Sequence, residues 1–506
     1  MRLLILLIIF SSSLAYGQSS SRTFYNQRLS DSIVKMGLLD QTAAGMPVKG
    51  MNWDEFSIYK DSIFHLNYNQ IRRIFNSYGY LGYNEIGESA ETSFWVIIQH
   101  CDFAPEFQSQ VLDSMKLEIS NKNANPKHYG LLYDRVHLNI DEKQLYGTQV
   151  RYNQNTGQAY PKPLSDSINV NNRRKELGFE SLEKYLNVMT LRHYDMNKQT
   201  LNDRGVFEPK LYDENQLNIA ITIDDVPNTR NYLSNNFHSG LLSQLDSLNI
   251  PVTIFINEGL LYKTDSINKN IDLLEKWSKR DYVTLGNHTF SHSRYSEVGY
   301  DQFVIDIEKG EILLKEFSYK FHKPLIHFRF PYNDLGIDSL QHLKIDSILK
   351  VKNYKSSPFT IESSDWMFNY IYEYYLSQSK SEKAKDIGQL YVSKTIDYIH
   401  FFDSLSNEKY GRSINQIYLC HDNTLNADYL NEIILELKKN EFTFISIDEA
   451  LTDSVYQQED NYYKKWGISW LYRWMPTQSE RVKWMYLEPD ISSIELLYQN
   501  LSKKNK

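Results

Sequence analysis

The chain has 506 residues, a formal net charge of −8 and a 41% share of hydrophobic residues. This length predicts more than one domain. The acidic balance, with no long basic run, argues against nucleic acid and against an anionic membrane surface as partners.

Residues 1–17 have the pattern of a cleavable signal peptide. A basic start and an apolar run precede Ala15 and Gly17, which stand at −3 and −1 of a cut before Gln18. The apolar run is too short to span a bilayer, no cysteine follows the cut as a lipid anchor, and no other stretch has the roughly 18 apolar residues of a membrane helix. The sequence therefore predicts a secreted or periplasmic protein with no membrane span.

Residues 22–197 are expected to form a mostly helical domain. Its polar motifs are Asp40-Gln41, Gln99-His100, Tyr133-Asp134-Arg135 and Gln144-Leu145-Tyr146-Gly147-Thr148-Gln149. These motifs resemble an uncharacterised domain family, the DUF6624 type, and the resemblance implies no function. A polar pocket that includes His100, Asp134 and Arg135 would explain them, but so would buried hydrogen-bond networks and helix caps.

A polar, turn-rich string at residues 198–205 predicts a domain break near residues 198–215. Beyond it, strand-like runs alternate with helical stretches, which predicts an α/β fold with a parallel barrel or sheet. The expected strands include residues 217–223, 252–256, 325–328, 417–419 and a closing strand at 442–447. The chain between Trp366 and Arg412 is expected to be a helical crossover.

Two short motifs in this region hold the groups of a hydrolytic metal site. His288 and His292 stand four residues apart, and on a helical turn this spacing lets one cation bridge both rings. Asp224 and Asp225 follow the first strand. Because neighbouring side chains of a strand point apart, these carboxylates are expected to differ in role. One would complete a ligand set with the histidines, and the other would handle protons.

The chemistry of amide hydrolysis suggests how these groups divide the work. A divalent cation held by Asp225, His288 and His292 would activate water and polarise the carbonyl. Asp224 is then the candidate general base. His421, which follows the strand at residues 417–419, is the candidate general acid that protonates the departing amine.

Three further motifs follow the histidine pair in order. They are Arg329-Phe330-Pro331-Tyr332, Glu362-Ser363-Ser364-Asp365-Trp366 and Leu419-Cys420-His421-Asp422. Together with the two acidic and histidine motifs, they resemble the NodB-homology polysaccharide deacetylases, carbohydrate esterase family 4. The resemblance covers roughly residues 215–452 and implies a distorted (β/α) barrel of the NodB type behind the helical domain.

The resemblance also implies a role for each catalytic residue. It agrees with Asp224 as base, Asp225 as metal ligand and His421 as acid. It further implies that Arg329 holds the base in place and that Asp365 orients His421 and tunes its pKa.

Substrate-binding roles are implied for three more residues. The backbone N–H of Tyr332 would help to bind the oxyanion, and Trp366 and Leu419 would line a small pocket for the acetyl methyl group. The sequence departs from the family pattern at Val226, where glycine is usual, and at Glu362, where aspartate is usual. A β-branched residue at position 226 is expected to narrow the site or to shift its substrate preference.

The expected function is therefore a secreted, metal-dependent deacetylase that hydrolyses N-acetyl groups of an amino-sugar polysaccharide or oligosaccharide. Zinc suits two imidazoles and a carboxylate, and cobalt or nickel would fit a similar geometry. An O-acetyl polysaccharide esterase and a catalytically weak carbohydrate-binding protein remain alternatives. The identity of the polysaccharide and the oligomeric state stay open.

Residues 453–506 form an aromatic C-terminal extension. Trp466, Trp470 and Trp474 stand at i, i+4 and i+8, which predicts one face of an amphipathic helix packed on the barrel. A platform that stacks on sugar rings is the alternative, and packing is favoured because aromatic residues at helical spacing usually mark burial.

Overall fold

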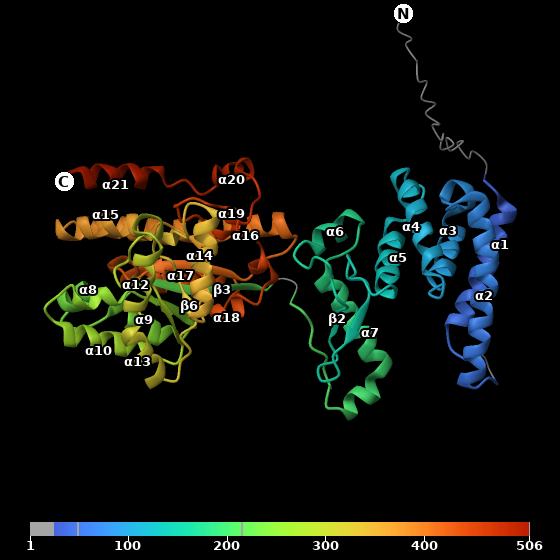
Figure 1. Cartoon of the computed structure of the whole chain (residues 1–506), viewed down its shortest axis with the longest axis horizontal. Coiled ribbons are helices and arrows are strands. Elements are labelled where there is room, and N and C mark those ends of the chain that lie inside the picture. The colour runs from blue at the N-terminus through green and yellow to red at the C-terminus, as the bar shows by residue number, and fades with distance from the viewer. Residues whose placement is uncertain (1–24, 48–49, 214–215, 505–506) are drawn as a thin grey trace, which may run out of the picture. The chain divides into compact units, whose positions relative to one another are not determined.

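The computed structural model describes residues 25–47, 50–213 and 216–504. The predicted signal peptide, residues 1–17, lies outside them. The chain forms two compact units, residues 1–212 and 213–506 (Figure 1). None of the described helices is long and apolar enough to cross a membrane.

The first unit is mostly helical, as predicted, around a core that includes Ile33, Ile71 and Phe94. Its helices are α1 (Gln27–Ala44), α2 (Trp53–Tyr78), α3 (Tyr83–Gln99), α4 (Pro105–Ser120), α5 (Pro126–Asn139), α6 (Val170–Glu176) and α7 (Leu182–Asp203), with a small hairpin of β1 (Val150–Tyr152) and β2 (Ala159–Pro161). The two units divide after Tyr212, within the predicted break at residues 198–215, and α7 runs through the polar string as far as Asp203. Leu201, buried within this polar string, ties the last turn of the helix to the unit.

Asp134 and Arg135 of the polar motifs belong to separate networks in the described structure, and only that of Asp134 is buried. The Asp134 carboxylate accepts hydrogen bonds from the backbone N–H groups of Leu145, Tyr146 and Thr148. The Arg135 guanidinium instead binds Asp102 at 2.6 Å. Asp134 therefore orders a loop, as a structural network does.

The second unit is built on a parallel sheet with the strand order β7-β6-β5-β4-β3-β9-β8. Its strands are β3 (Leu217–Val226), β4 (Val252–Ile256), β5 (Val283–Asn287), β6 (His327–Phe328), β7 (Lys355–Ser356), β8 (Ile361–Glu362), β9 (Gln416–His421) and β10 (Phe442–Phe444). β10 pairs with the first three residues of β3. All five residues of β4 are buried, which is typical of a parallel strand covered on both faces. The sheet curls but stays open between β7 and β8 in the described chain, so the predicted distorted barrel is confirmed as an incomplete one.

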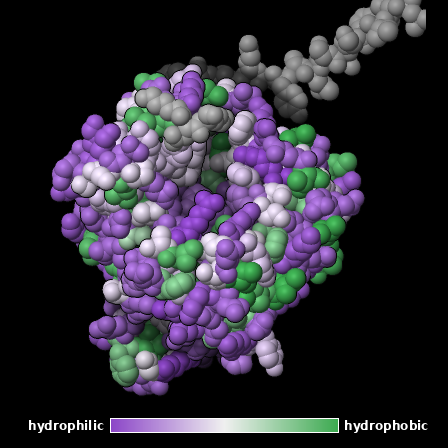
Figure 2. All heavy atoms as spheres, turned by 90° about the vertical axis from the view of Figure 1, so that its left-hand side faces the viewer, coloured by the Kyte–Doolittle hydropathy of each residue, from purple (hydrophilic) through white to green (hydrophobic). Residues whose placement is uncertain are grey.

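Helices cover this sheet and connect its strands (Figure 1). They are α8 (Thr229–Ser234), α9 (Gly240–Leu248), α10 (Ile267–Ser278), α11 (Tyr295–Val298), α12 (Tyr300–Lys309), α13 (Ile312–Lys320), α14 (Ser339–Val351), α15 (Asp365–Ser377), α16 (Ser381–Tyr410), α17 (Thr424–Lys439), α18 (Ile447–Ala450), α19 (Trp470–Arg473), α20 (Gln478–Met485) and α21 (Ser492–Lys504), with short 3₁₀ turns at Glu258–Tyr262, Pro331–Asn333 and Ser454–Gln457. α15 and α16 are the predicted helical crossover. The face of this unit seen in Figure 2 is mostly hydrophilic, with hydrophobic residues scattered over it.

The closing strand predicted at residues 442–447 ends early, at Phe444. Ser446 starts α18 instead, because its hydroxyl accepts the Glu449 N–H while the Glu449 carboxylate accepts the Ser446 N–H. Such a reciprocal capping box marks the start of a helix. The prediction overlooked it because the apolar residues at 442–447 favoured a strand.

The single aromatic helix expected in the C-terminal extension is also wrong. α19 contains only Trp470–Arg473, and Ser469 caps it by accepting the Leu471 N–H. Trp474 is 5% exposed and its ring lies 6.3 Å from that of Trp470, so these two tryptophans pack as expected. Trp466 lies outside the helix and is 58% exposed.

Candidate active site

The acidic pair lies at the carboxyl end of β3, where the strand is irregular. Asp225 has a φ of 59°, and the register of β3 against β4 shifts between Ile223 and Val226. In a regular strand, neighbouring side chains point to opposite faces, which is why Asp224 and Asp225 were expected to point apart. The bulge interrupts this alternation. Asp224 Oδ2 and Asp225 Oδ1 each lie 3.9 Å from Nε2 of His288, so both carboxylates face one site.

The histidine pair lies in a loop after β5, and the expected helical turn is wrong. Thr289 and His292 both have positive φ, at 64° and 57°. The Asn287 side chain accepts the Thr289 N–H at 2.7 Å, and the Thr289 hydroxyl accepts the His292 N–H at 3.2 Å. These local side-chain bonds replace helical ones and turn both rings toward Asp225.

The three expected metal ligands converge. One ligand atom from each of Asp225, His288 and His292 lies within 4.8 Å of the other two. Ligands bound about 2.1 Å from a tetrahedral zinc lie about 3.4 Å apart. Asp225 Oδ1 is 3.4 Å from His292 Nε2 and 3.9 Å from His288 Nε2, so a small contraction would complete the set.

The protonation state of His288 suits a metal ligand. Its Nδ1 donates a hydrogen bond to the backbone carbonyl of Arg329 at 2.8 Å, which leaves the lone pair of Nε2 free toward Asp225. Burial lowers the pKa of both His288 and His292 to about 4, so both rings are neutral at pH 7. Burial opposes ionisation of Asp225, but His292, His288 and His421 together outweigh it, so the pKa of Asp225 is lowered.

Arg329 holds Asp224, as the sequence predicts. Its NH1 lies 3.2 Å from Asp224 Oδ1 and also donates to the Thr222 hydroxyl at 2.9 Å. The guanidinium is fully buried, donates to the carbonyls of Ser357 and Pro358, and lies 4.3 Å above the Phe255 ring. Burial raises the pKa of Asp224 although Arg329 opposes the rise, which increases the proton affinity of this carboxylate.

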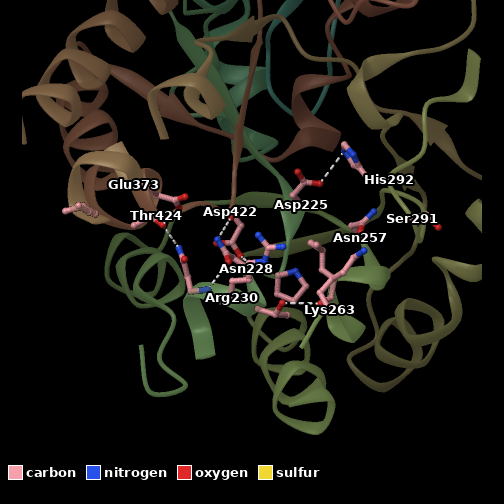
Figure 3. Close-up of a pocket in the computed structure, with 15 residues that line it drawn as sticks. Asp225, Asn228, Arg230, Asn257, Lys263, Ser291, His292, Glu373, Asp422 and Thr424 are labelled. Atoms are coloured by element: carbon pink, nitrogen blue, oxygen red, sulfur yellow. Dashed lines mark hydrogen bonds and ion pairs between the residues drawn. The ribbon is translucent and has the colours of Figure 1, made fainter. Parts of the chain in front are cut away.

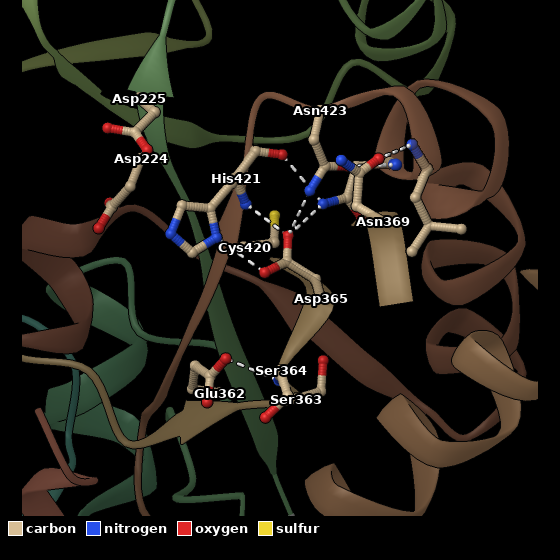
Figure 4. A network of polar contacts seen from close by, with 12 residues as sticks. Asp224, Asp225, Glu362, Ser363, Ser364, Asp365, Asn369, Cys420, His421 and Asn423 are labelled. Atoms are coloured by element: carbon tan, nitrogen blue, oxygen red, sulfur yellow. Dashed lines mark hydrogen bonds and ion pairs between the residues drawn. The ribbon is translucent and has the colours of Figure 1, made fainter. Parts of the chain in front are cut away.

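The His421 side chain is held in place by Asp365 (Figure 4). Its Nδ1 lies 2.7 Å from Asp365 Oδ1, and its backbone N–H donates to Asp365 Oδ2 at 2.8 Å. The side-chain amides of Asn423 and Asn426 donate to the same oxygen. Burial opposes protonation of His421, but the Asp365 carboxylate raises its pKa to about 10, so the ring is charged at neutral pH.

Base and acid candidates sit at the ends of adjacent strands. Asp224 of β3 and His421 of β9 are register partners in the parallel pairing. The Asp422 N–H donates to the Asp224 carbonyl at 3.0 Å and continues this pairing. The carboxyl ends of parallel strands are where such sheets carry their sites.

The three expected substrate-binding residues differ in their surroundings. Tyr332 is 47% exposed, and its ring lies 4.5 Å from that of the ligand His292. Trp366 is also half-exposed and packs edge-on against Tyr498 at 5.3 Å. Leu419 is buried in a cluster with Phe359. The structure thus brings Tyr332 directly to the ligand set.

Neither departure from the family pattern displaces a catalytic candidate. Val226 is fully buried and does not line the cavity at the site, in contrast to its neighbours Asp225 and Pro227. Glu362 accepts the Ser364 N–H at 2.6 Å, and its burial together with the nearby Asp365 raises its pKa to about 7.

A cavity of about 680 Å³ opens beside Asp225 and His292 (Figure 3). Its lining includes polar residues to which the sequence analysis assigned no role, namely Asn228, Arg230, Asn257, Lys263, Glu373, Asp422 and Thr424. Most of them follow β3, β4 and β9, so their position after predicted strands was the signal that would have found them. Such a surface offers many hydrogen-bonding groups to a polar ligand.

A family model described as polysaccharide deacetylase matches residues 212–345 of this chain. The second unit carries a polysaccharide deacetylase domain. A second model, described as a family of unknown function (DUF6624), matches residues 47–197 in the first unit. Both expected resemblances are thereby confirmed. No match is found among curated proteins.

Several solved structures are similar to about half of this chain. The peptidoglycan N-acetylglucosamine deacetylase Bc1960 is 18% identical, with 48% of this chain and 91% of that chain covered and a TM-score of 0.32. The family 4 carbohydrate esterase PdaA of Bacillus subtilis is 18% identical, with 47% and 82% covered and a TM-score of 0.30. BA3943 of Bacillus anthracis, described as a CE4 family pseudoenzyme, is 14% identical, with 51% and 80% covered and a TM-score of 0.32.

Proposed function

We propose that this protein is a secreted, metal-dependent deacetylase that removes N-acetyl groups from an amino-sugar polysaccharide or oligosaccharide. The observation that carries the proposal is the convergence of a two-histidine, one-carboxylate ligand set with the buried Asp224 carboxylate on one side. The signal-peptide pattern of residues 1–17 supports secretion.

The donor set fits a divalent cation of the zinc type, with cobalt or nickel as further options. Asp225, His288 and His292 would hold it through one carboxylate oxygen and two neutral Nε2 atoms. When bound, such a cation would polarise the acetyl carbonyl and lower the pKa of a water molecule. The backbone N–H of Tyr332 would add a hydrogen bond to the developing oxyanion.

The proton transfers fall to the two strand-end residues. Asp224 would take the proton of the attacking water through Oδ2, because Oδ1 is engaged by Arg329. His421 would donate a proton through Nε2 to the departing nitrogen, because Nδ1 is engaged by Asp365. An amine leaves only when it is protonated, and the charged imidazole of His421 would supply that proton, as it would to the leaving oxygen of an ester.

Acetate release tests this proposal. Zinc-loaded mature protein, from Gln18 onward, would be incubated with N-acetylglucosamine oligomers and with acetylated xylan. The Asp224→Asn and His288→Ala variants would run beside it, with His322→Ala as a matched control because His322 is exposed and outside the site.

We expect release from the amino-sugar oligomers that both active-site substitutions abolish and that His322→Ala preserves. If acetate were released from xylan alone, the proposed substrate would be an O-acetyl ester instead of an N-acetyl amide. If the metal-loaded protein released acetate from neither polymer, the alternative of a catalytically weak carbohydrate-binding protein would stand instead.

A further inference from the structure

A series of neighbouring aromatic and guanidinium groups leads outward from the metal-ligand set, and it begins with the edge-on contact of His292 and Tyr332. The His292 ring lies 4.5 Å from the Tyr332 ring, and the Arg294 guanidinium carbon lies 3.9 Å from the centre of that same ring. The Arg294 guanidinium also lies 5.8 Å from the ring of Trp466. No step in this series exceeds 5.8 Å, so the indole of Trp466 stands within the span of a few sugar rings from the candidate site.

The backbone of the C-terminal extension is anchored to this series. A Cβ atom on Gly467 would lie 2.3 Å from the Tyr332 carbonyl oxygen, so only glycine permits this close approach. Arg294 also donates from NH1 to the Lys465 carbonyl at 3.1 Å. Trp466 is therefore held beside Tyr332 by its two chain neighbours, although the family model that matches residues 212–345 does not include it.

The two rings are exposed although they are held in place. Trp466 is 58% exposed and Tyr332 is 47% exposed. Core packing therefore does not explain why an aromatic residue stands at either position. The cations beside them already have acidic partners, since Lys465 Nζ lies 3.6 Å from Glu297 and Arg294 Nε lies 3.9 Å from it. Arg294 lies over one face of Tyr332, and Lys465 Nζ lies 5.1 Å from the centre of the Trp466 ring, so the surface offers the exposed remainder of each ring rather than a free charge.

We propose that Tyr332 and Trp466 form an aromatic platform that binds a sugar ring of the substrate next to the residue that reacts. The apolar C–H face of a pyranose packs on an aromatic ring by dispersion while its hydroxyl groups stay in water. A rigid ring loses little conformational entropy when it binds, which suits such a surface. This inference rests on the proposed function and adds the two residues that bind a second sugar ring of the substrate.

Chain length gives the first test. Trp466→Ala should lower kcat/KM for the N-acetylglucosamine hexamer roughly tenfold more than for the dimer, through KM, because one stacking contact is lost. Trp466→Tyr, which keeps an aromatic face, should restore most of the preference for the hexamer. Trp53→Ala is the matched control, because Trp53 is 65% exposed and lies in the first unit. An unchanged ratio of hexamer to dimer in Trp466→Ala would overturn the platform while leaving the deacetylase proposal intact.

Binding gives the second test, and it does not depend on turnover. Calorimetric titration of the Asp224→Asn protein with chitohexaose and with xylohexaose would be compared with the Asp224→Asn, Trp466→Ala double variant. We expect at least one hexamer to bind, and its Kd to rise roughly tenfold in the double variant. Equal affinities in the two proteins, or binding of neither hexamer, would reject the platform even if acetate release fails in every assay.

Discussion

The backbone carbonyl of Arg329 accepts the Nδ1–H of His288 at 2.8 Å, while the side chain of the same arginine binds Asp224 at 3.2 Å. One residue therefore orients a candidate metal ligand and fixes the candidate base. Both functions come from the carboxyl end of the short strand β6, which explains why a buried arginine is retained there despite its desolvation cost.

Replacement of Arg329 by methionine should destabilise the second unit strongly. The substitution leaves the Asp224 carboxylate buried without its cation, which costs about 3–5 kcal/mol for a broken buried pair. Urea-induced unfolding of the mature chain measures the loss. Arg280→Met is the control, because its pair with Asp246 is partly exposed and should contribute less than about 1 kcal/mol. Similar losses in the two variants would contradict the assigned role of the buried pair.

Removal of one imidazole should abolish metal binding. His288→Ala deletes a ligand and the hydrogen bond that its other ring nitrogen makes to the Arg329 carbonyl, so the zinc content of purified protein should fall from one equivalent to near zero. Metal analysis after dialysis measures this, and His322→Ala should keep one equivalent. A His288→Ala protein that retained zinc with unchanged affinity would place the metal elsewhere.

Asp365 should control the titration of His421. Asp365→Asn removes the carboxylate that raises the pKa of His421 to about 10, so this pKa should fall toward its ordinary value near 6.5. NMR titration of metal-free protein with labelled histidine measures the change. Asp428→Asn is the control, because Asp428 binds Tyr372 rather than His421. The assignment fails if the His421 pKa stays near 10 without Asp365.

The same pair predicts a pH dependence of stability. Since the folded-state pKa of His421 is raised, its charged form stabilises the fold fully below about pH 6.5, and this contribution is lost as the pH rises toward 10. The difference in unfolding free energy between the unsubstituted protein and His421→Gln should therefore be larger at pH 6 than at pH 10. Chemical denaturation at both values measures it, and a difference that grows with pH would have the wrong sign.

A methyl group at Gly259 should disturb the histidine loop. A Cβ there would lie 2.2 Å from the Phe290 carbonyl oxygen, which accepts the Gly259 N–H in the middle of the loop between His288 and His292. Gly259→Ala should cost about 1–3 kcal/mol of stability through overpacking and should weaken zinc binding. Gly240→Ala is the control, because its nearest neighbour would be 3.6 Å away. Calorimetric zinc titration of both variants would show whether only the loop variant is impaired.

The sequence alone was sufficient to predict individual strands and the motifs that supply the candidate site residues. The buried strand at residues 252–256 was predicted with its observed bounds, because β-branched and aromatic residues are enriched in strands. The order of the acidic, histidine and arginine motifs also identified the groups that now lie together around His288. Their catalytic roles remain predictions that the variants above test.

The tertiary structure decided the directions of the side chains and the distant contacts. The backbone is left-handed at Asp225, His292 and Tyr332, and a periodic pattern of residue types carries no trace of this conformation. The contact of Gly467 with Tyr332 joins segments far apart in the chain. Sequence periodicity indicates how neighbouring residues are arranged within one helix or strand. The exposed position of Trp466 depends instead on contacts between distant segments, which form only when the second unit folds.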